Sequence, residues 1–317
     1  MTIRRRDVFL AIICSLTVVA VAALLFSRSY HEPNLESIVE IWADVIRDLD
    51  QVGKTVTRVS AKREMEIGRG IEKEIARYWP IKHDPANQYY VAKVGQLVLE
   101  HTQRKGIEYR FYILDAPFIN AFALPGGGIY ITTGMLDFLE SEAELAALLG
   151  HEISHVDLRH CIDRLQYELA VRKIGGSDLA AITRIGYMLI GLAFSEQQEL
   201  EADAGGAILA AKARYDPRAA LPIFERLAKF QAGMRGERNR QRGKPTTMVE
   251  ELGIAVGKAL EQYFATHPPT DTRIRELNTV FARNTRAWHG RRFYVGRSNY
   301  QERIPRSRHD RPVEWIG

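Results

Sequence analysis

Cysteine is scarce in this chain of 317 residues, which contains only Cys14 and Cys161. Two cysteines cannot form the dense disulfide framework of a small secreted domain. The sequence has no internal repeat, which excludes solenoids and propellers built from short units. The glycines at positions 126–128 are not followed by Gly-Lys-Ser or Gly-Lys-Thr, and a strand is predicted after them, so they do not form a phosphate-binding loop. The remaining composition, 46% hydrophobic and 26% charged, predicts a globular protein with a substantial core.

Positive charge is concentrated in three segments of the chain, whose net charge is +5. Residues 286–317 contain eight arginines and three acidic residues, residues 233–247 contain five basic residues and one acidic residue, and residues 1–7 contain three arginines and one aspartate. The rest of the chain therefore carries a net charge of −6. This distribution argues against nucleic acid as a partner. The aromatic, basic tail 286–317 is expected to dock on the acidic body or on lipid phosphates.

One long apolar run lies near the N-terminus. Residues 8–26 contain no charge and follow three arginines at positions 4–6. This length predicts a transmembrane helix, and the arginines predict a cytoplasmic N-terminus. We therefore interpret residues 1–27 as a membrane anchor. The alternative is a cleaved signal peptide with its cleavage site at residues 20–22.

Residues 28–64 are predicted to form a linker helix. Seven apolar residues alternate in spacings of four and three, as on one seam of a helix: Ile38, Trp42, Val45, Leu49, Val52, Val56 and Val59. Through residues 38–59 the seam could pair with a second copy of the chain and form a homo-oligomer. Alternatively, it packs on the chain's own catalytic domain.

Residues 65–285 are predicted to form one continuous domain. Helices are expected over 71–78 and 89–102, and strands over 109–114, 120–124 and 129–132. The apolar segment 179–194 contains Arg184, which favours a buried or lid helix over a second membrane span. A further helix is expected to begin at Pro217 and end near residue 231.

The chemistry of the chain is indicated by an H-E-x-x-H motif made by His151, Glu152 and His155. Ser141 and Glu144 have the pattern of a capping box, which predicts the start of the helix that carries the motif. Two histidines four residues apart lie on one helical face, so both imidazoles can reach one metal ion. Glu152 is placed to take a proton from water activated by that ion. The alternative is a surface helix whose polar residues are solvated.

A zinc site of this kind needs a third protein ligand and an open fourth position. Glu199 is the candidate, on a second helix predicted to begin after Ser195. Asp203 lies four residues further along and shares its face. His160 is interpreted as structural, because a third ligand from the same helix as His155 would overshoot the ion.

The two motifs together resemble those of peptidase family M48, in which H-E-x-x-H is followed some tens of residues later by E-x-x-x-D. The resemblance covers residues 65–285 and includes residues 120–127, before the family's active-site edge strand, and residues 266–270, like the family's late His-Pro element. It implies an α+β, zincin-like fold that is mainly α-helical with a small β-sheet. The family includes membrane-bound prenyl proteases with several spanning helices and bacterial envelope proteases. The single apolar run at the N-terminus argues against prenyl-protein processing.

Carried over position by position, the resemblance implies one Zn²⁺ per chain, held by His151, His155 and Glu199. Glu152 would act as the general base. The zinc would polarise the scissile carbonyl and lower the pKa of its water. Glu152 would return the proton to the leaving amine.

The resemblance also implies roles for residues around the metal. Asp203 would orient a ligand histidine. His267 would either donate to the tetrahedral oxyanion or cap the zinc in a resting state; the alternative is a histidine that is only hydrogen-bonded at a helix entry. A substrate is expected to add as a strand beside residues 128–131. The predicted substrate-binding residues are Asn120, Ala121, Gly127, Gly128, Ile129 and Tyr130.

We therefore predict a single-pass, membrane-anchored zinc metalloendopeptidase with its catalytic domain outside the cytoplasm, in the bacterial periplasm. Its partners would be unfolded or misassembled envelope proteins and the membrane, with no nucleic acid. One alternative is a catalytically weak, zinc-stabilised chaperone or assembly factor, although Glu152 argues against it because inactive relatives commonly lose the base. The other is a basic interaction protein that acts through residues 286–317.

Overall fold

A computed structural model describes residues 59–171, 178–190, 193–229, 267 and 271–317. The predicted membrane anchor, the linker helix up to residue 58 and the basic segment 233–247 lie outside these residues. The homo-oligomer seam also lies outside them, apart from Val59. Within the described ranges, no helix has both the length and the apolar character needed to cross a membrane.

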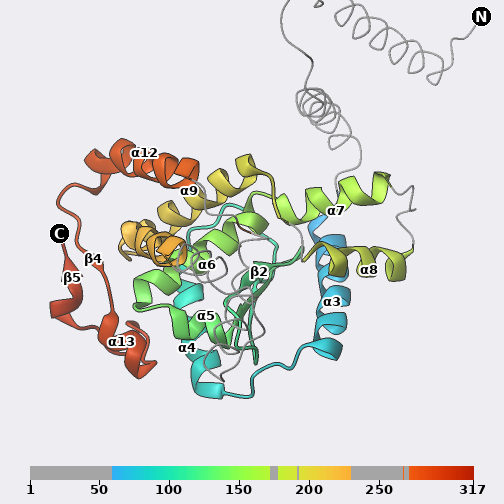
Figure 1. Ribbon diagram of the computed structural model, residues 1–317, viewed down its shortest axis with the longest axis horizontal. Coiled ribbons are helices and arrows are strands. Elements are labelled where there is room, and N and C mark those ends of the chain that lie inside the picture. Colours follow the sequence, from blue (N-terminus) through green and yellow to red (C-terminus); the bar gives the residue numbers. More distant parts are fainter. Residues whose placement is uncertain (1–58, 172–177, 191–192, 230–266, 268–270) are drawn as a thin grey trace, which may run out of the picture. The chain divides into compact units, whose positions relative to one another are not determined.

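A three-stranded sheet occupies the middle of the described domain (Figure 1). It consists of β1 (Arg110–Leu114), β2 (Ala121–Ala123) and β3 (Gly128–Thr132), arranged in the order β1-β3-β2. The central strand β3 runs parallel to β1 and antiparallel to β2. The three predicted strands are therefore confirmed to within one residue at each end.

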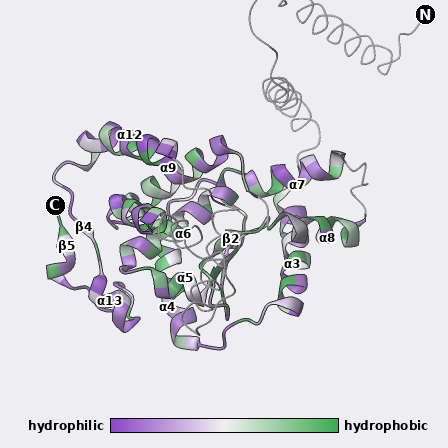
Figure 2. Ribbon diagram, in the orientation of Figure 1, coloured by the Kyte–Doolittle hydropathy of each residue, from purple (hydrophilic) through white to green (hydrophobic). Residues whose placement is uncertain are grey.

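The sheet separates two hydrophobic cores. Successive residues of β3 face opposite sides, so Ile129 and Ile131 enter one core and Tyr130 enters the other. The first core is filled by α4 (Pro85–Leu99) and α6 (Glu142–Asp157). The second is filled by α3 (Ala61–Tyr78), α7 (His160–Val171) and α8 (Leu179–Leu189). In Figure 2 the strands are mainly hydrophobic, whereas the helices carry both hydrophobic and hydrophilic residues along their length.

The apolar segment that begins at residue 179 forms a helix with one buried face, while Leu179, Ala180 and Arg184 are exposed. Ile182 and Ile185 of α8 lie in the second core against α3 and α7. Asp216 and Pro217 begin the 3-10 turn η1 (Pro217–Ala219), and a helix follows over residues 220–229. The sequence predicts the position of this helix but not the 3-10 turn that precedes it.

Helix α9 (Glu196–Lys212) begins with a complete capping box at Ser195. The box predicted at Ser141 is only half formed. The Ser141 hydroxyl accepts a hydrogen bond from the Glu144 N–H, but the Glu144 carboxylate accepts from the Glu140 N–H instead of from Ser141. The same carboxylate also pairs with Arg226 at 2.5 Å, which turns it away from the cap.

Helices α6 and α9 cross with almost no side chain between them. Gly150 and Gly206 face each other at the crossing: a Cβ on Gly150 would lie 2.9 Å from the Gly206 carbonyl oxygen, and a Cβ on Gly206 would lie 2.7 Å from the His151 nitrogen. A larger residue at either position would push the helices apart. The main chains of the two motif-bearing helices are therefore in direct contact.

The C-terminal segment is part of the domain rather than a free tail. Its elements are α12 (Asp271–Trp288), β4 (Phe293–Tyr294), α13 (Arg297–Glu302), η2 (Pro312–Glu314) and β5 (Trp315–Ile316). Tyr294 and Tyr300 are buried in the first core. The backbone N–H of Arg306 donates to the buried carboxylate of Glu142 at 3.0 Å, and its guanidinium lies over the ring of Tyr215. Docking on the body of the protein is therefore confirmed for this segment.

Candidate metal centre

Helix α6 carries the H-E-x-x-H motif into the interior, where His151, Glu152 and His155 are all buried. The Nε2 atoms of His151 and His155 lie 3.1 Å apart, because about one helical turn separates the residues. Glu199 on the first turn of α9 reaches both rings: its Oε1 is 3.5 Å from His155 Nε2, and its Oε2 is 3.6 Å from His151 Nε2. The structure thus brings the three predicted ligands together.

His267 joins this group from the segment before α12. Its side chain is 1% exposed, and its Nδ1 lies 2.9 Å from Glu199 Oε1 and 3.3 Å from His151 Nε2. One ligand atom each from His151, His155, Glu199 and His267 fits within a span of 4.8 Å. Within the described ranges, this is the one cluster that could hold a metal ion. His267 therefore lies within reach of a metal held by the other three residues.

The donor set and its spacing fit zinc. A tetrahedral ion with ligands at about 2.0–2.1 Å holds its ligand atoms roughly 3.3 Å apart. Five separations within the cluster lie between 2.9 and 3.6 Å, and the whole set of ligand atoms spans no more than 4.8 Å. Imidazole nitrogens with one carboxylate suit zinc, whereas magnesium and calcium prefer oxygen ligands. Burial lowers the pKa of His155 well below its usual range, which keeps the ring neutral and its lone pair available to a metal.

Glu152 is fully buried beside the cluster. Within the described part of the chain, neither of its carboxylate oxygens accepts a hydrogen bond. The ring of His267 is close, with its Nε2 at 3.6 Å from Glu152 Oε1. Burial raises the pKa of Glu152, against the opposing effect of His267 and His151. A buried carboxylate that accepts no hydrogen bond is energetically costly unless a ligand or water supplies one.

Asp203 lies behind His151, as predicted. Its Oδ1 is 2.9 Å from His151 Nδ1, so with Nε2 turned to the cluster the Nδ1–H donates to the carboxylate. Arg273 of α12 donates twice to the same carboxylate, at 2.7 Å each, and its Nη1 lies 2.8 Å from Glu199 Oε2. Burial alone would raise the pKa of Asp203, but Arg273 outweighs it and holds that pKa below its usual range.

His160 supports the other ligand histidine and stays outside the cluster. Its Nδ1 is 3.0 Å from His155 Nδ1, and its Nε2 is 3.1 Å from Glu201 Oε2. With His155 Nε2 facing the cluster, the hydrogen bonds run from His155 to His160 and from His160 to Glu201. The prediction that His160 is structural is consistent with this chain of contacts.

The strand predicted to pair with a substrate, residues 128–131, is the central strand of the sheet and not an edge strand. Residues 128–131 belong to β3, and both edges of β3 are already paired, with β1 and β2. The N–H of Leu124 donates to the Gly128 carbonyl, and the N–H of Thr132 donates to the Asn120 carbonyl. Since alternate residues of β2 bond to β3, the peptide groups of Ala121 and Ala123 point to the opposite edge. Strand pairing through residues 128–131 is therefore excluded. Within the described ranges, no strand pairs with the other edge of β2.

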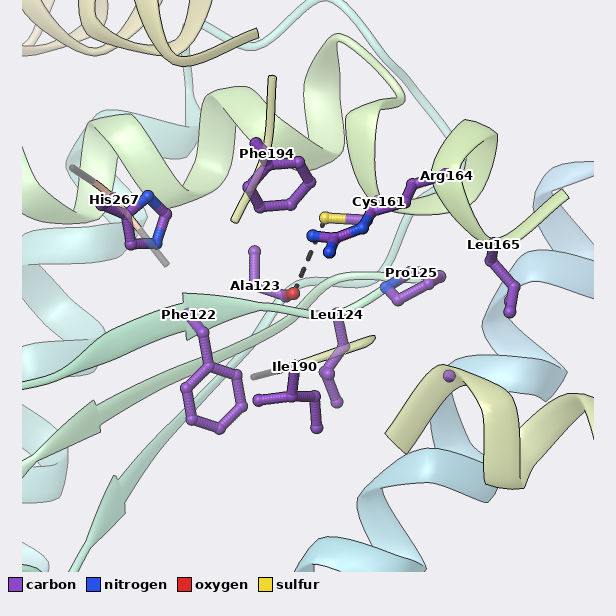
Figure 3. Close-up of a pocket in the computed structure, with 11 residues that line it drawn as sticks. Phe122, Ala123, Leu124, Pro125, Cys161, Arg164, Leu165, Ile190, Phe194 and His267 are labelled. Atoms are coloured by element: carbon purple, nitrogen blue, oxygen red, sulfur yellow. Dashed lines mark hydrogen bonds between the residues drawn. The ribbon is translucent and has the colours of Figure 1, made fainter. Parts of the chain in front are cut away.

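A small cavity of about 30 Å³ lies along this edge, and His267 contributes to its lining (Figure 3). The Cys161 thiol donates to the Ala123 carbonyl across a distance of 3.6 Å. Phe194 closes one side and stacks on His155, with ring centroids 3.9 Å apart. The other walls are largely apolar and include Phe122, Leu124, Pro125, Leu165 and Ile190. The edge of β2, the cavity and the metal cluster are therefore contiguous.

Two residues near the cluster are missing from the sequence-based predictions. Arg273 is one arginine in an arginine-rich chain, and only its place six residues after His267 hints at a role. Phe194 lies directly before Ser195, the cap of α9, and resembles any apolar residue that precedes a helix. Neither residue belongs to a sequence motif, so the spacing of residues does not predict the contact of Arg273 with Asp203 or of Phe194 with His155.

A sequence model of a protein family described as peptidase family M48 matches residues 85–280. Among individual proteins, the mitochondrial metalloendopeptidase OMA1 of Arabidopsis thaliana is 31% identical over 180 residues, which is 55% of this chain and 32% of the relative. The beta-barrel assembly-enhancing protease of Escherichia coli (strain K12) is 26% identical over 208 residues, 60% of this chain and 43% of the relative. A protease HtpX homolog of Ralstonia nicotianae is 28% identical over 225 residues, 62% of this chain and 75% of the relative. The matched regions thus span less than half of the first two relatives.

Proposed function

This chain belongs to peptidase family M48, and from that premise we propose that it is a zinc-dependent endopeptidase that cuts extended segments of proteins. The main support for the proposal is the burial of Glu152 and the absence of a hydrogen bond to its carboxylate in the described ranges. Its carboxylate is fully buried, accepts no hydrogen bond in the described ranges and lies 3.6 Å from His267 Nε2, beside the cluster in which the Nε2 atoms of His151 and His155 converge. A buried acid so placed is suited to proton transfer, because burial raises its pKa above the usual value of a glutamate.

We assign the ligand role to His151, His155 and Glu199, with His267 as a capping residue at the fourth position. When bound, zinc would polarise the scissile carbonyl and make a water molecule more acidic. Glu152 takes the proton of the attacking water at its free carboxylate and delivers it to the leaving amine. For a substrate to enter, the ring of His267 would turn away from Glu199 and His151. Its Nε2, which already faces Glu152 at 3.6 Å, then donates to the reacting carbonyl oxygen.

The substrate is proposed to lie along β2. An extended peptide can pair with the outward peptide groups of Ala121 and Ala123, as in other cases of strand addition, and would replace the Cys161 thiol at the Ala123 carbonyl. Such pairing requires about three residues of accessible main chain, which favours unfolded or loop segments over folded ones. Of the predicted substrate-binding residues, this proposal keeps Asn120 and Ala121 near the substrate. Gly127, Gly128, Ile129 and Tyr130 support β2 from within the sheet.

We propose that residues 1–27 anchor the enzyme in a membrane and that its substrates are unfolded or misassembled envelope proteins. The apolar run at residues 8–26 supports the anchor. The name of one relative, a beta-barrel assembly-enhancing protease, supports an envelope role. Protease accessibility in intact spheroplasts tests the orientation: the domain should be digested from the periplasmic side, and protection until lysis would reject it.

The enzymatic proposal is tested with the full chain purified in detergent. Glu152→Gln keeps the size of the side chain but removes the base, so casein cleavage should fall by at least about 100-fold while zinc remains near one ion per chain. Glu225→Gln, at an exposed position on the helix over residues 220–229, is the matched control and should cleave like the wild type.

Equal cleavage by the Glu152 variant and the wild type would reject the mechanism. Zinc-loaded wild-type protein that prevents aggregation of an unfolded client but cleaves no substrate would favour the alternative, a zinc-stabilised chaperone or assembly factor.

A further inference from the structure

The end of β2 that borders the metal cluster is held by helix α3, on the far side of the sheet from α6. The link is made through Gly126, two residues before β3 begins. The Gly126 N–H donates to Glu64 Oε1 at 3.1 Å. Its carbonyl accepts from Arg110 Nη2 at 3.3 Å, and the same nitrogen lies 2.6 Å from Glu72 Oε1. Both polar groups of one residue in the β2–β3 turn are therefore tied, directly or through one arginine, to two acids of α3.

The turn packs so closely against α3 that no side chain fits at Gly126. Gly126 has φ +80°, and a Cβ there would lie 2.7 Å from the Glu64 carbonyl oxygen and 2.7 Å from the Met65 Cα. The turn thus lies against the main chain of α3, where only glycine fits. The carboxylates fix its position along the helix, because hydrogen bonds to charged groups are directional and about twice as strong as neutral ones.

Glu64 is fully buried. Its nearest charge partner is Arg104, which also reaches α6, and Arg159 Nη1 lies further away, at 4.0 Å from Glu64 Oε2. Arg104 donates to both Glu64 oxygens, at 3.2 and 2.5 Å, and to the Val156 carbonyl at 2.6 Å. Val156 follows His155 directly at the end of α6. One ionic network therefore connects the turn after β2 with the helix that carries the H-E-x-x-H motif.

The other end of β2 is held without α3. The Thr132 hydroxyl accepts from the Asn120 N–H at 3.0 Å, and the Thr132 N–H donates to the Asn120 carbonyl at 3.0 Å. The two ends of the strand thus have separate supports. The end supported by α3 is the one next to the site, because Ala123, Leu124 and Pro125 line the same cavity as His267.

We propose that Glu64 and Glu72 are positioning residues for the peptidase reaction: they hold the open edge of β2 at the distance from the metal cluster at which a substrate strand can pair. The proposal rests on the proposed function in that β2 must be the strand that binds substrate. Neither acid touches substrate or metal. Their loss should therefore weaken binding of an extended substrate and leave the chemical step and the zinc site intact.

The test compares Glu64→Gln and Glu72→Gln with Glu66→Gln in the full chain purified in detergent. Glu66 is the matched control, since it lies on the same helix, is 46% exposed and pairs only locally with Arg63 at 3.1 Å. With a long fluorogenic peptide, each of the first two variants should raise KM by about 5-fold or more while kcat changes by less than about twofold. Zinc affinity, measured by competition with a chromophoric chelator, should equal that of the wild type.

Hydrogen–deuterium exchange supplies a readout that needs no cleavage. Amides over residues 119–127 should exchange faster in the Glu64 and Glu72 variants than in the Glu66 control. Because Glu64→Gln leaves Arg104 buried without its charge partner and can impair folding, Glu72→Gln is the decisive variant: Glu72 and Arg110 are 14% and 18% exposed.

Unchanged KM and unchanged exchange in Glu72→Gln would overturn the positioning role. A fall in kcat together with zinc affinity would also overturn it, because the acids would then support the metal site itself. Wild-type protein without Glu152-dependent cleavage would instead reject the proposed function, and the exchange measurement would still decide whether α3 positions β2.

Discussion

Replacing Asp203 with asparagine is expected to weaken zinc binding while leaving all four ligand side chains in place. The Asp203 carboxylate accepts from His151 Nδ1 at 2.9 Å and from two nitrogens of Arg273 at 2.7 Å each. Asparagine has one acceptor oxygen in place of two, so its amide N–H₂ must face a donor of Arg273 or of His151. The ring of His151 then loses its fixed tautomer and orientation.

The size of the effect follows from two contributions with the same sign. Loss of a hydrogen bond that orients a metal ligand typically lowers metal affinity 10- to 100-fold. Removal of a buried negative charge next to a divalent cation adds to this loss, because the attraction is poorly screened there. We therefore expect the zinc dissociation constant to rise by about 10- to 100-fold, equivalent to about 1.4–2.7 kcal/mol.

The assay is competition for zinc between the protein and a chromophoric chelator at neutral pH. Glu196→Gln is the matched control, since it removes the same charge from an exposed position in the first turn of the same helix, α9. A dissociation constant for Asp203→Asn that equals the control value would refute the proposed support of His151. Circular dichroism of both variants excludes global unfolding as the cause of weaker binding.

Three further predictions follow from other contacts. Removing the imidazole in His160→Ala should raise the zinc dissociation constant about 10-fold, because His155 loses its hydrogen-bond acceptor; an unchanged constant in the same chelator assay would contradict this. Burial raises the pKa of Glu142 in the folded protein, so its contribution to stability is fully present below its usual value of 4.5 and is lost as the pH rises through the folded-state pKa. Urea unfolding should therefore show Glu142→Gln gaining stability relative to wild type as the pH increases, and a difference that does not change with pH would be inconsistent with this. Arg306→Met should lower the free energy of unfolding by about 2 kcal/mol, because the guanidinium loses its contacts with Tyr215 and with the carbonyls at the end of α9; a urea curve identical to wild type would show that these contacts contribute nothing.

The parts of the site that depend on helical spacing could be predicted from the sequence. His151 and His155 are four residues apart, as are Glu199 and Asp203, and a helix converts that spacing into a shared face. The strands were also predictable, because turn residues bound short runs rich in apolar residues. Such patterns describe local structure, which the chain determines over a few residues.

Features that depend on how elements pair could not be predicted in this way. Nothing in residues 128–131 shows that β3 is central and β2 is the outer strand, because that order is set by pairing with β1, whose residues lie about 20 positions earlier. Arg273 reaches Asp203 only because α12 packs against α9, 70 residues apart in sequence. The buried tyrosines of the C-terminal segment are likewise indistinguishable in the sequence from exposed aromatic residues of a basic tail.

The glycine contact between α6 and α9 has a consequence for ion selectivity. Because Gly150 and Gly206 let the two main chains touch, the separation of the two helices that carry the histidine pair and Glu199 is set by backbone contact. The helices that carry the metal ligands are therefore held at a fixed separation before a metal ion binds. Such a site loses little conformational entropy on binding, and it discriminates by radius. Ions that require longer bonds or more than four donors would have to push these two helices apart. Because the helix backbones are in contact, the fold disfavours binding of such ions.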